Sequence, residues 1–358
     1  MTGTLDAMPR CEYLDGSDQR IVIGQPYAAP DGNGALIYTC LVAGDSRKNL
    51  GGCPNANIGN PASSFSGNKY QLEEDLPAST FPIRRVYNSK QFPTENSGFG
   101  RGWTASFEQK IKRLSATEVE ISRADGRAFK FFEVSGVFTP EADGKGRLIK
   151  QVGIGWMYFD DGHVDFFDAG GEFVQRRLSN GASVTLTFSN VDFYGPGSTP
   201  SRKLTKVSDH LGREFNLIYG ATGFITRISG GGSFVDYSYD SARNLSARTI
   251  SGVARTYIYD EPAYSSAPFA HALTGVVDES GNRFATYRYS ADGKATSTEH
   301  SGGANAYSLS FGSSTSTTVT DPLGVSRAYS FEVSHGVKRL TGVSQPGGPG
   351  CGASSSAI

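Results

Sequence analysis

The stretch LTKVSDHLGREFNLIY, residues 204–219, shows how this chain is built. Leu204 and Val207 lie in its first half, Asp209 and Gly212 in the middle, and the second half is a strand-like run in which Phe215, Leu217 and Tyr219 are two residues apart. Alternation with a period of two is typical of a strand with one buried face. Aspartate accepts hydrogen bonds from turn backbone, and glycine adopts the positive φ that tight turns require. The stretch therefore predicts a β-hairpin.

The same frame, L-x-x-V-x-D-x-x-G-R followed by an aromatic strand, recurs along the chain. Later copies carry the same pair of turn residues, Asp278 with Gly281 and Asp321 with Gly324. Two related runs end in the pairs Tyr239–Asp240 and Tyr259–Asp260, and weaker relatives lie at residues 159–162 and 167–170. Internal repeats of this size bury their apolar faces only against their neighbours. Because the spacing of the copies is irregular, we expect one continuous curling sheet rather than a propeller with equal blades.

Aromatic residues two positions apart support this interpretation, since they share one face of a strand. Such pairs are Tyr237 with Tyr239, Tyr257 with Tyr259, and Tyr287 with Tyr289. No stretch of a dozen residues has the i, i+3, i+4, i+7 apolar spacing of an amphipathic helix. The predicted fold class is all-β, with repetitive antiparallel hairpins that form a continuous curled or spiralling sheet.

Composition excludes several classes of protein. The chain has 358 residues, 11% of them aromatic, which is more than a disordered polypeptide carries. Its 34 basic and 35 acidic residues balance to a net charge of −1, so the charge predicts no nucleic-acid partner. No apolar run approaches the roughly 20 residues of a membrane-spanning helix.

The cysteines and the two ends of the chain leave alternatives open. Cys11, Cys40 and Cys53 lie in the first 53 residues, and Cys351 lies near the end. One disulfide among the first three in an oxidising compartment and three free thiols are both compatible with the sequence. Met1–Arg10 lacks the pattern of a signal peptide, so we expect export by another route or a missing start. The Gly/Pro/Ser-rich residues 347–358 suggest a fragment or a truncated repeat array.

Three motifs in fixed order resemble the Rhs/YD-repeat superfamily. The first is NPASSFSGNKYQLEED at 60–75, the second RVYNS at 85–89 and the third FGRGW at 99–103. They are similar to the module that precedes Rhs repeats, and the Tyr-Asp pairs and D-x-x-G-R turns are similar to the repeats themselves. The residues that carry the resemblance are Asn60, Pro61, Gly67, Asn68, Lys69, Asp75, Arg85, Tyr87, Asn88, Gly100, Gly102, Trp103, Asp209, Gly212, Arg213, Tyr239, Asp240, Tyr259, Asp260, Asp278, Gly281, Asp321 and Gly324.

The resemblance implies a division of the chain. Residues 1–56 form an unassigned cysteine-containing segment, 57–130 the pre-repeat β module, 131–343 the repeats, and 344–358 a tail. Rhs proteins build a hollow β-shell around a C-terminal toxic effector. The implied function is therefore a non-catalytic wall segment of a polymorphic toxin used in interbacterial competition. The implied partners are further Rhs repeats, a toxin domain, and components of a secretion apparatus or cell surface, and the implied location is secreted or at the cell surface.

Several candidate sites compete with structural explanations. Asp321-Pro322 resembles a self-cleavage pair, but Asp-Pro also suits a type I turn. The carboxylates Asp160, Asp161, Asp165, Asp168 and Glu172 are of the type that binds Ca²⁺, yet their spacing fits no EF-hand loop. Asp209-His210 lacks a nucleophile elbow, and the glycines at 98, 100 and 102 lack a phosphate-loop frame. For Arg84 and Arg85, a cross-strand pair is favoured over phosphate binding.

We accordingly predict no catalytic residue, no cofactor and no metal. The remaining histidines, His163, His271, His300 and His335, are scattered. The alternative function is an extracellular YD-repeat adhesion or carbohydrate-binding module that acts through exposed aromatic side chains.

Overall fold

The computed structural model describes the backbone of residues 11–14, 20–24, 27–30 and 36–39. With side chains it describes residues 47–51, 57–76, 81–91, 98–142, 144–192, 200–334 and 336–344. In these residues the structure is β-strand with two short 3₁₀ turns, η1 (Arg47–Asn49) and η2 (Ser301–Gly303), and no α-helix. The predicted all-β class is confirmed. The side chains of the four cysteines, His335, and residues 345–358 lie outside this description.

The first half of the chain forms small sheets. Two hairpins come first, β1 (Cys11–Leu14) with β2 (Arg20–Gly24) and β3 (Tyr27–Pro30) with β4 (Leu36–Thr39). The next five strands are β5 (Asn57–Ile58), β6 (Ala62–Ser63), β7 (Tyr70–Leu76), β8 (Ile83–Asn88) and β9 (Trp103–Ala105). We call the described residues between 57 and 109 the plug. A four-stranded sheet follows, with β10 (Lys110–Arg113), β11 (Glu118–Ser122), β12 (Ala128–Val134) and β13 (Val137–Pro140).

The second half is one antiparallel sheet of eighteen strands in chain order, which we call the wall. Its strands are β14 (Arg147–Gln151), β15 (Gly155–Asp160), β16 (His163–Asp168), β17 (Phe173–Leu178), β18 (Ser183–Val191), β19 (Ser201–Asp209), β20 (Glu214–Tyr219), β21 (Ile225–Gly230), β22 (Ser233–Tyr239), β23 (Leu245–Ile250), β24 (Val253–Tyr259), β25 (Leu273–Val277), β26 (Arg283–Tyr289), β27 (Ala295–His300), β28 (Tyr307–Ser313), β29 (Ser316–Thr320), β30 (Ser326–Ser334) and β31 (Val337–Val343). The predicted division at residue 130 falls inside β12, and the domain boundaries remain predictions.

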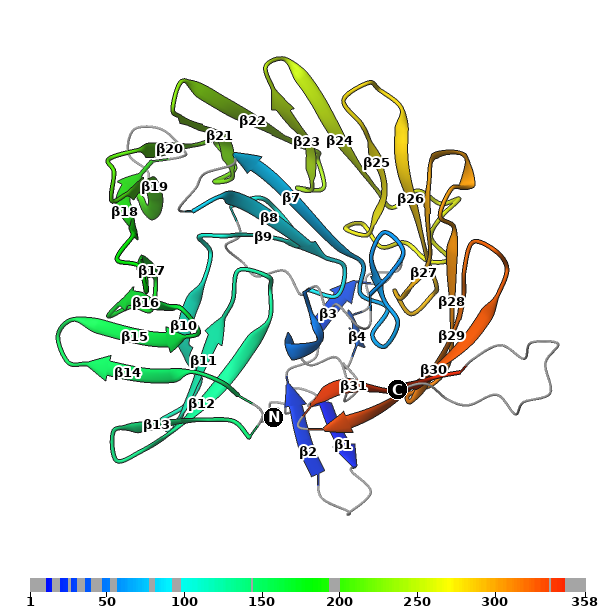
Figure 1. Cartoon of the computed structure of the whole chain (residues 1–358), viewed down its shortest axis with the longest axis horizontal. Coiled ribbons are helices and arrows are strands. Elements are labelled where there is room, and N and C mark those ends of the chain that lie inside the picture. Colours follow the sequence, from blue (N-terminus) through cyan, green and yellow to red (C-terminus); the bar gives the residue numbers. More distant parts are fainter. Residues whose placement is uncertain are drawn as a thin grey trace, which may run out of the picture.

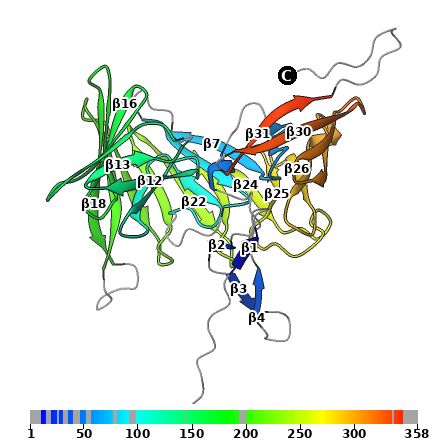
Figure 2. The same cartoon turned by 90° about the horizontal axis from the view of Figure 1, so that it is seen from below.

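The wall curls around the plug. Figure 1 shows β14 to β31 as an arc, with β7, β8 and β9 on its concave side. Seen from below in Figure 2, β7 lies between the two sides of the arc, with β16 and β18 on one side and β26 and β30 on the other. Among the described strands, β14 and β31 do not pair with each other, so strand pairing does not close the sheet. The predicted continuous curled sheet is thus confirmed.

The turns follow the predicted chemistry. At the hairpin of residues 204–219, the amide of Gly212 donates to the carbonyl of Asp209 (3.0 Å), and the Asp209 amide donates to the carbonyl of Arg213 (3.0 Å). Oδ1 of Asp209 accepts from the amides of Leu211 and Arg213 at 2.9 and 3.0 Å. Gly212 has a φ of +78°, as a hairpin turn that ends in a left-handed residue requires. The turns at Asp278 and Asp321 repeat this pattern. Arg243 takes the left-handed position after Asp240, with a φ of +68°.

Besides the turn hydrogen bonds, tyrosine hydroxyls also stabilise the hairpins, which the repeat pattern did not predict. The last tyrosine of a hairpin donates its hydroxyl to the carbonyl of a residue at or near the start of that hairpin, and these pairs are Tyr219 with Leu204, Tyr239 with Ile225, Tyr259 with Leu245, and Tyr289 with Leu273. The distances are 2.7 to 2.9 Å. Each tyrosine therefore buries its ring toward the concave side and satisfies a backbone carbonyl of its own hairpin.

Candidate functional site at the plug–wall interface

One side of β7 is polar and buried. Lys69, Gln71, Glu73 and Asp75 alternate along the chain and so share one side of the strand, and all are at most 9% exposed. Leu72, on the opposite side, is 49% exposed. A β-bulge at Asp75 ends the regular register with β8. β7 therefore presents its charged side, rather than its apolar one, to the wall.

Asp75 forms the strongest contact of this row, with Arg85 of β8. Neither side chain is exposed, and Nη2 of Arg85 lies 2.8 Å from Oδ1 of Asp75. Tyr237 of the wall donates to Oδ2 of Asp75 (2.8 Å), and Arg85 donates to the hydroxyl of Tyr257 (3.1 Å). Burial opposes the charge of Arg85, but Asp75 and the tyrosines outweigh it and raise its pKa. Asp75 therefore compensates the charge of the buried Arg85 guanidinium.

Four aromatic rings surround the Arg85 guanidinium. Its carbon lies 4.7 Å from the ring centroid of Trp103 and 5.3 to 5.5 Å from those of Phe99, Tyr237 and Tyr257. Ring faces attract a cation, and here they replace water around it. Two of the rings come from the plug and two from the wall, so the cation holds the two parts together.

Lys69 lies at the other end of the row, fully buried over the ring of Tyr287 (4.2 Å). Its Nζ donates to the carbonyl of Asn60 (2.8 Å), to the carbonyl of Tyr70, and to Oε1 of Gln71 (3.0 Å). Burial lowers the pKa of Lys69, and the charge of Glu73 opposes this shift. Carbonyl oxygens rather than a contacting carboxylate thus satisfy this ammonium group.

The middle of the row links these ends. Gln71 donates to Oε1 of Glu73 (3.0 Å) and accepts from the Tyr287 hydroxyl (3.2 Å). Glu73 also pairs with Arg255 of β24 (3.3 Å). The row from Lys69 to Asp75 is therefore a connected polar network along the wall, and such a network favours one register of the plug.

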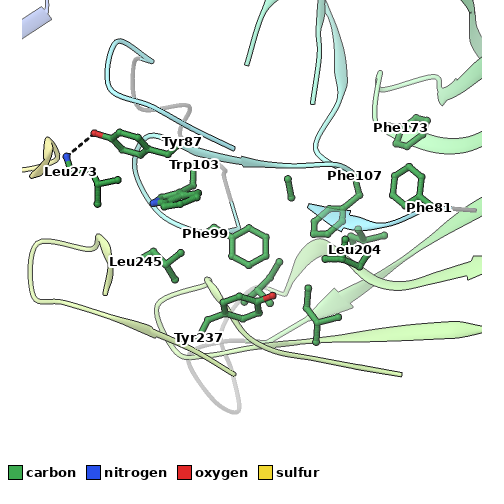
Figure 3. Close-up of a cluster of buried hydrophobic side chains, with 14 of the residues drawn as sticks. Phe81, Tyr87, Phe99, Trp103, Phe107, Phe173, Leu204, Tyr237, Leu245 and Leu273 are labelled. Carbon is green, nitrogen blue, oxygen red and sulfur yellow. Dashed lines mark hydrogen bonds between the residues drawn. The ribbon is translucent and has the colours of Figure 1, made fainter. Parts of the chain in front are cut away.

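Aromatic side chains fill the rest of the interface (Figure 3). The hydroxyl of Tyr87 donates to the carbonyl of His271 (2.7 Å) and accepts from the amide of Leu273 (2.9 Å), which begins β25. Trp103 donates to the hydroxyl of Tyr259 (2.9 Å) and meets the ring of Tyr257 edge-on at 5.1 Å. The plug thus supplies hydrogen-bond partners to buried backbone groups of the wall.

The glycines of the F-G-R-G-W motif allow this close contact. Gly100 and Gly102 have φ values of +81° and +78°. A Cβ at Gly102 would lie 2.5 Å from the Tyr87 ring, and one at Gly100 would lie 2.6 Å from the carbonyl oxygen of Arg243. Both the backbone conformation and the space therefore require glycine.

Asparagines join the loops of the plug. Oδ1 of Asn88 accepts from the amide of Gly51 and the side chain of Asn68, both at 2.8 Å, and its Nδ2 donates to the carbonyl of Asp125 (2.9 Å). The amide of Asn60 donates to Thr298 (3.2 Å), while the carbonyl of Pro61 accepts from Tyr70 (3.1 Å). Gly67 hydrogen-bonds to Ala295 through its carbonyl (2.8 Å). Most motif residues between 60 and 103 thus contact the wall, whereas Pro61, Asn68 and Asn88 hydrogen-bond within the first half of the chain. The motif residues from 209 onward lie in the wall itself.

The acidic cluster does not converge on one point. Asp165 accepts two 2.7 Å hydrogen bonds from Arg176, Asp160 pairs with Arg123, Asp168 with Arg202, and Glu172 with Lys110. Four of the five carboxylates thus have a basic partner, and the fifth, Asp161, is exposed in the turn after β15. In the part of the chain with described side chains, no group of three or more His, Cys, Asp or Glu residues is arranged to hold a metal ion.

The other candidates have structural partners. Asp321 caps its turn and pairs with Arg327 (2.8 Å), and Asp209 is held by its turn and by Arg213 (2.6 Å). Arg84 is half exposed and pairs with Glu74 across the strands (2.6 Å), as predicted. Arg85, by contrast, is completely buried. Sequence reasoning missed Gln71, Glu73 and the wall tyrosines as partners, although the alternation of polar residues from 69 to 75 was a usable signal.

A hollow of about 370 Å³ lies between the plug and β18–β20, lined in part by Phe107, Leu204 and Tyr219. This volume is in the range of small-molecule pockets and far below that of a protein domain. None of the helical turns among the described residues is long and apolar enough to cross a membrane.

A family model described as a domain of unknown function, DUF6531, matches residues 59–131. No curated protein matches the chain. A crystal structure of TcdB2-TccC3-TEV is 11% identical, with a TM-score of 0.23, over 88% of this chain and 22% of that chain. A Tc holotoxin pore of Photorhabdus luminescens is 11% identical, with a TM-score of 0.25, over 92% of this chain and 15% of that one. The chain thus spans less than a quarter of the solved chains that it matches.

Proposed function

We propose that this chain is a non-catalytic wall segment of an Rhs-type toxin shell, with a built-in plug. One observation carries the proposal: eighteen strands pair only with the strands next to them in sequence, and they curl around a plug that is buried against them. A repetitive sheet of this kind can be lengthened hairpin by hairpin without changing its existing contacts. Its role would be physical exclusion, since a wall keeps an enclosed effector from its targets until release.

The effector would not lie where the plug lies. In this chain the concave side is occupied by Arg85, Tyr87 and Trp103 and the wall tyrosines that contact them. An enclosed domain therefore requires additional wall from further repeats. The partners proposed are those repeats, a toxin domain and components of a secretion apparatus or cell surface, and the location proposed is secreted or at the cell surface.

The absence of catalysis is part of the proposal. The carboxylates with the most buried side chains, Asp75 and Asp165, each form an ion pair with an arginine. A general acid or base needs a proton that it can exchange with a substrate, and in these pairs the carboxylates are enclosed and hydrogen-bonded to a guanidinium.

The adhesion alternative has less support. The exposed phenylalanines of the wall are Phe234 and Phe284. Arg227 lies over the ring of Phe234 (4.3 Å), and Arg255 and His300 contact that of Phe284 (5.0 and 4.9 Å). A sugar stacks on a free ring face, and neighbouring cations already occupy faces of these rings.

Electron microscopy of the protein expressed from its complete reading frame tests the proposal. We expect this wall to continue beyond β31 around an interior volume. A solid interior, or a chain that ends as an isolated arc, would contradict the shell role.

In parallel, the purified chain is assayed on nuclease, protease and glycoside substrates, and we expect no turnover. An activity abolished by one carboxylate substitution would refute the non-catalytic role.

A further inference from the structure

The last strand of the wall is contacted by a residue from near the start of the chain. Asn49, in η1, is 4% exposed. Its Oδ1 accepts from the backbone amide of Lys338 (3.1 Å), and its Nδ2 donates to the carbonyl of Gly336 (3.1 Å). One carboxamide thus bonds an amide and a carbonyl of the same strand end, as a peptide unit of a neighbouring strand would.

These groups lie on the outer edge of β31. β31 pairs with β30 on one side, and the two are joined by a tight turn between Ser334 and Val337. In a hairpin the backbone groups of alternate residues point away from the partner strand, which here exposes those of Lys338. An uncovered outer strand can pair with other chains, and Asn49 covers the start of this one.

The same turn also contacts the four-stranded sheet, whose last strand β13 lies next to β14, the first strand of the arc. Arg47 donates to Glu120 (2.6 Å) and Ser122 (3.0 Å) of β11. Lys48 pairs with Glu141, directly after β13, at 2.5 Å, and its side chain is only 7% exposed. In Figure 1, β11–β13 and β31 lie on the two sides of the opening of the arc. Three consecutive residues therefore span this opening.

We propose that Arg47–Asn49 is a clasp that closes the curled wall. Arg47 and Lys48 form ion pairs with the four-stranded sheet and Glu141, and Asn49 hydrogen-bonds to the start of β31. The amide of Gly51 donates to Asn88 and so connects the clasp to the plug (2.8 Å). The clasp joins parts that strand pairing leaves apart. It covers only the start of the outer edge of β31, so the rest of that edge is left for the further strands of the proposed wall. This inference goes beyond the wall role and stands without it.

Amide hydrogen exchange of the full chain, followed by mass spectrometry, tests the clasp. Asn49→Ala is expected to speed exchange in residues 336–343 about tenfold, because a buried hydrogen-bonded pair is lost. The double variant Arg47→Ala/Lys48→Ala is expected to speed exchange in the same segment, although the polar contacts described for these two residues are with the four-stranded sheet and Glu141. Exchange in residues 233–250 is expected to stay unchanged. Lys110→Ala, which removes an ion pair of the same four-stranded sheet with Glu172, is the matched control and leaves β31 unchanged.

If Arg47–Asn49 acts as a clasp, the contacts of Arg47 and Lys48 and those of Asn49 must depend on each other. In the triple variant Arg47→Ala/Lys48→Ala/Asn49→Ala, amide exchange in residues 336–343 is expected to be at most about twofold faster than in Asn49→Ala. Loss of one set of contacts is already sufficient to free the start of β31. If amide exchange in β31 is unchanged in the double variant, Asn49 stabilises β31 independently of Arg47 and Lys48, and the proposal is overturned. Equal acceleration in β22–β23 would do the same, because it would show general destabilisation.

Discussion

Arg85 and Asp75 form an ion pair in which neither side chain is exposed, and tyrosines from the wall hydrogen-bond to both residues. The two charges come from adjacent strands of the plug, while Tyr237 and Tyr257 lie more than 160 residues further along the chain. The pair therefore makes the packing of the plug depend on the folded wall.

Removal of one partner of this pair should be severe. We expect Arg85→Met to lower the free energy of unfolding by about 3–5 kcal/mol, because the buried Asp75 loses its hydrogen-bonded guanidinium and keeps only the more distant Arg248 (4.0 Å). Denaturation in urea measures it. Arg84→Ala, at the neighbouring exposed pair with Glu74, serves as the control and should cost at most about 1 kcal/mol. Equal losses for the two arginines would show that burial does not set the importance of the pair.

The turn glycines should differ according to their surroundings. Gly212 has positive φ, but a Cβ there would meet no atom within 4 Å, so Gly212→Ala should cost about 1–2 kcal/mol from backbone strain alone. A Cβ at Gly171 would lie 1.9 Å from the carbonyl oxygen of Ile111. Gly171→Ala should therefore cost more than Gly212→Ala. Thermal unfolding of both variants decides this, and the reverse order would contradict the steric argument.

The tyrosine hydroxyls should each stabilise their own hairpin. Tyr289→Phe leaves the buried carbonyl of Leu273 without this donor, at a cost of about 0.5–1.5 kcal/mol. Tyr307 is half-buried, and its hydroxyl makes no hydrogen bond to the described residues, so Tyr307→Phe is the matched control and should change stability little. Urea unfolding followed by fluorescence measures both. An unchanged Tyr289→Phe would show that the carbonyl is satisfied by other means.

Acid should weaken the pair of Asp165 with Arg176. Burial acts to raise the pKa of Asp165, but hydrogen bonds from Arg176 and His163 outweigh it and lower the pKa below the ordinary 3.8. Because the folded state binds this proton less readily, the stabilisation is present above pH 3.8 and lost as pH falls through the lower folded pKa. The stability difference between wild type and Asp165→Asn should therefore shrink between pH 6 and acid pH. A difference that grows on acidification would reverse the assigned sign.

The repeats could be predicted from sequence because their causes are local. The turn at Asp209 depends on hydrogen bonds within five residues and on the φ of Gly212. The partner strands of each hairpin lie within about twenty residues of each other, and the two-residue spacing of Phe215, Leu217 and Tyr219 is sufficient to predict a half-buried strand. The order of the eighteen strands follows from such neighbours alone.

The seating of the plug could not be predicted in the same way. In β7 the alternation of Tyr70, Leu72 and Leu76 with polar residues suggests that the polar side faces water, whereas Gln71, Glu73 and Asp75 are the buried residues. Their partners Tyr287, Arg255 and Tyr237 lie 162 to 216 residues away, and no local pattern connects them.

The sequence by itself therefore determined the hairpins, their turns and their succession, since hydrogen bonds and backbone angles within a few residues fix each of them. Only the tertiary structure decided that the sheet curls around the plug, that a charged row is buried there, and that Asn49 meets Lys338. These contacts join distant segments, and a polar side chain is stable inside only when complementary groups from elsewhere in the chain surround it.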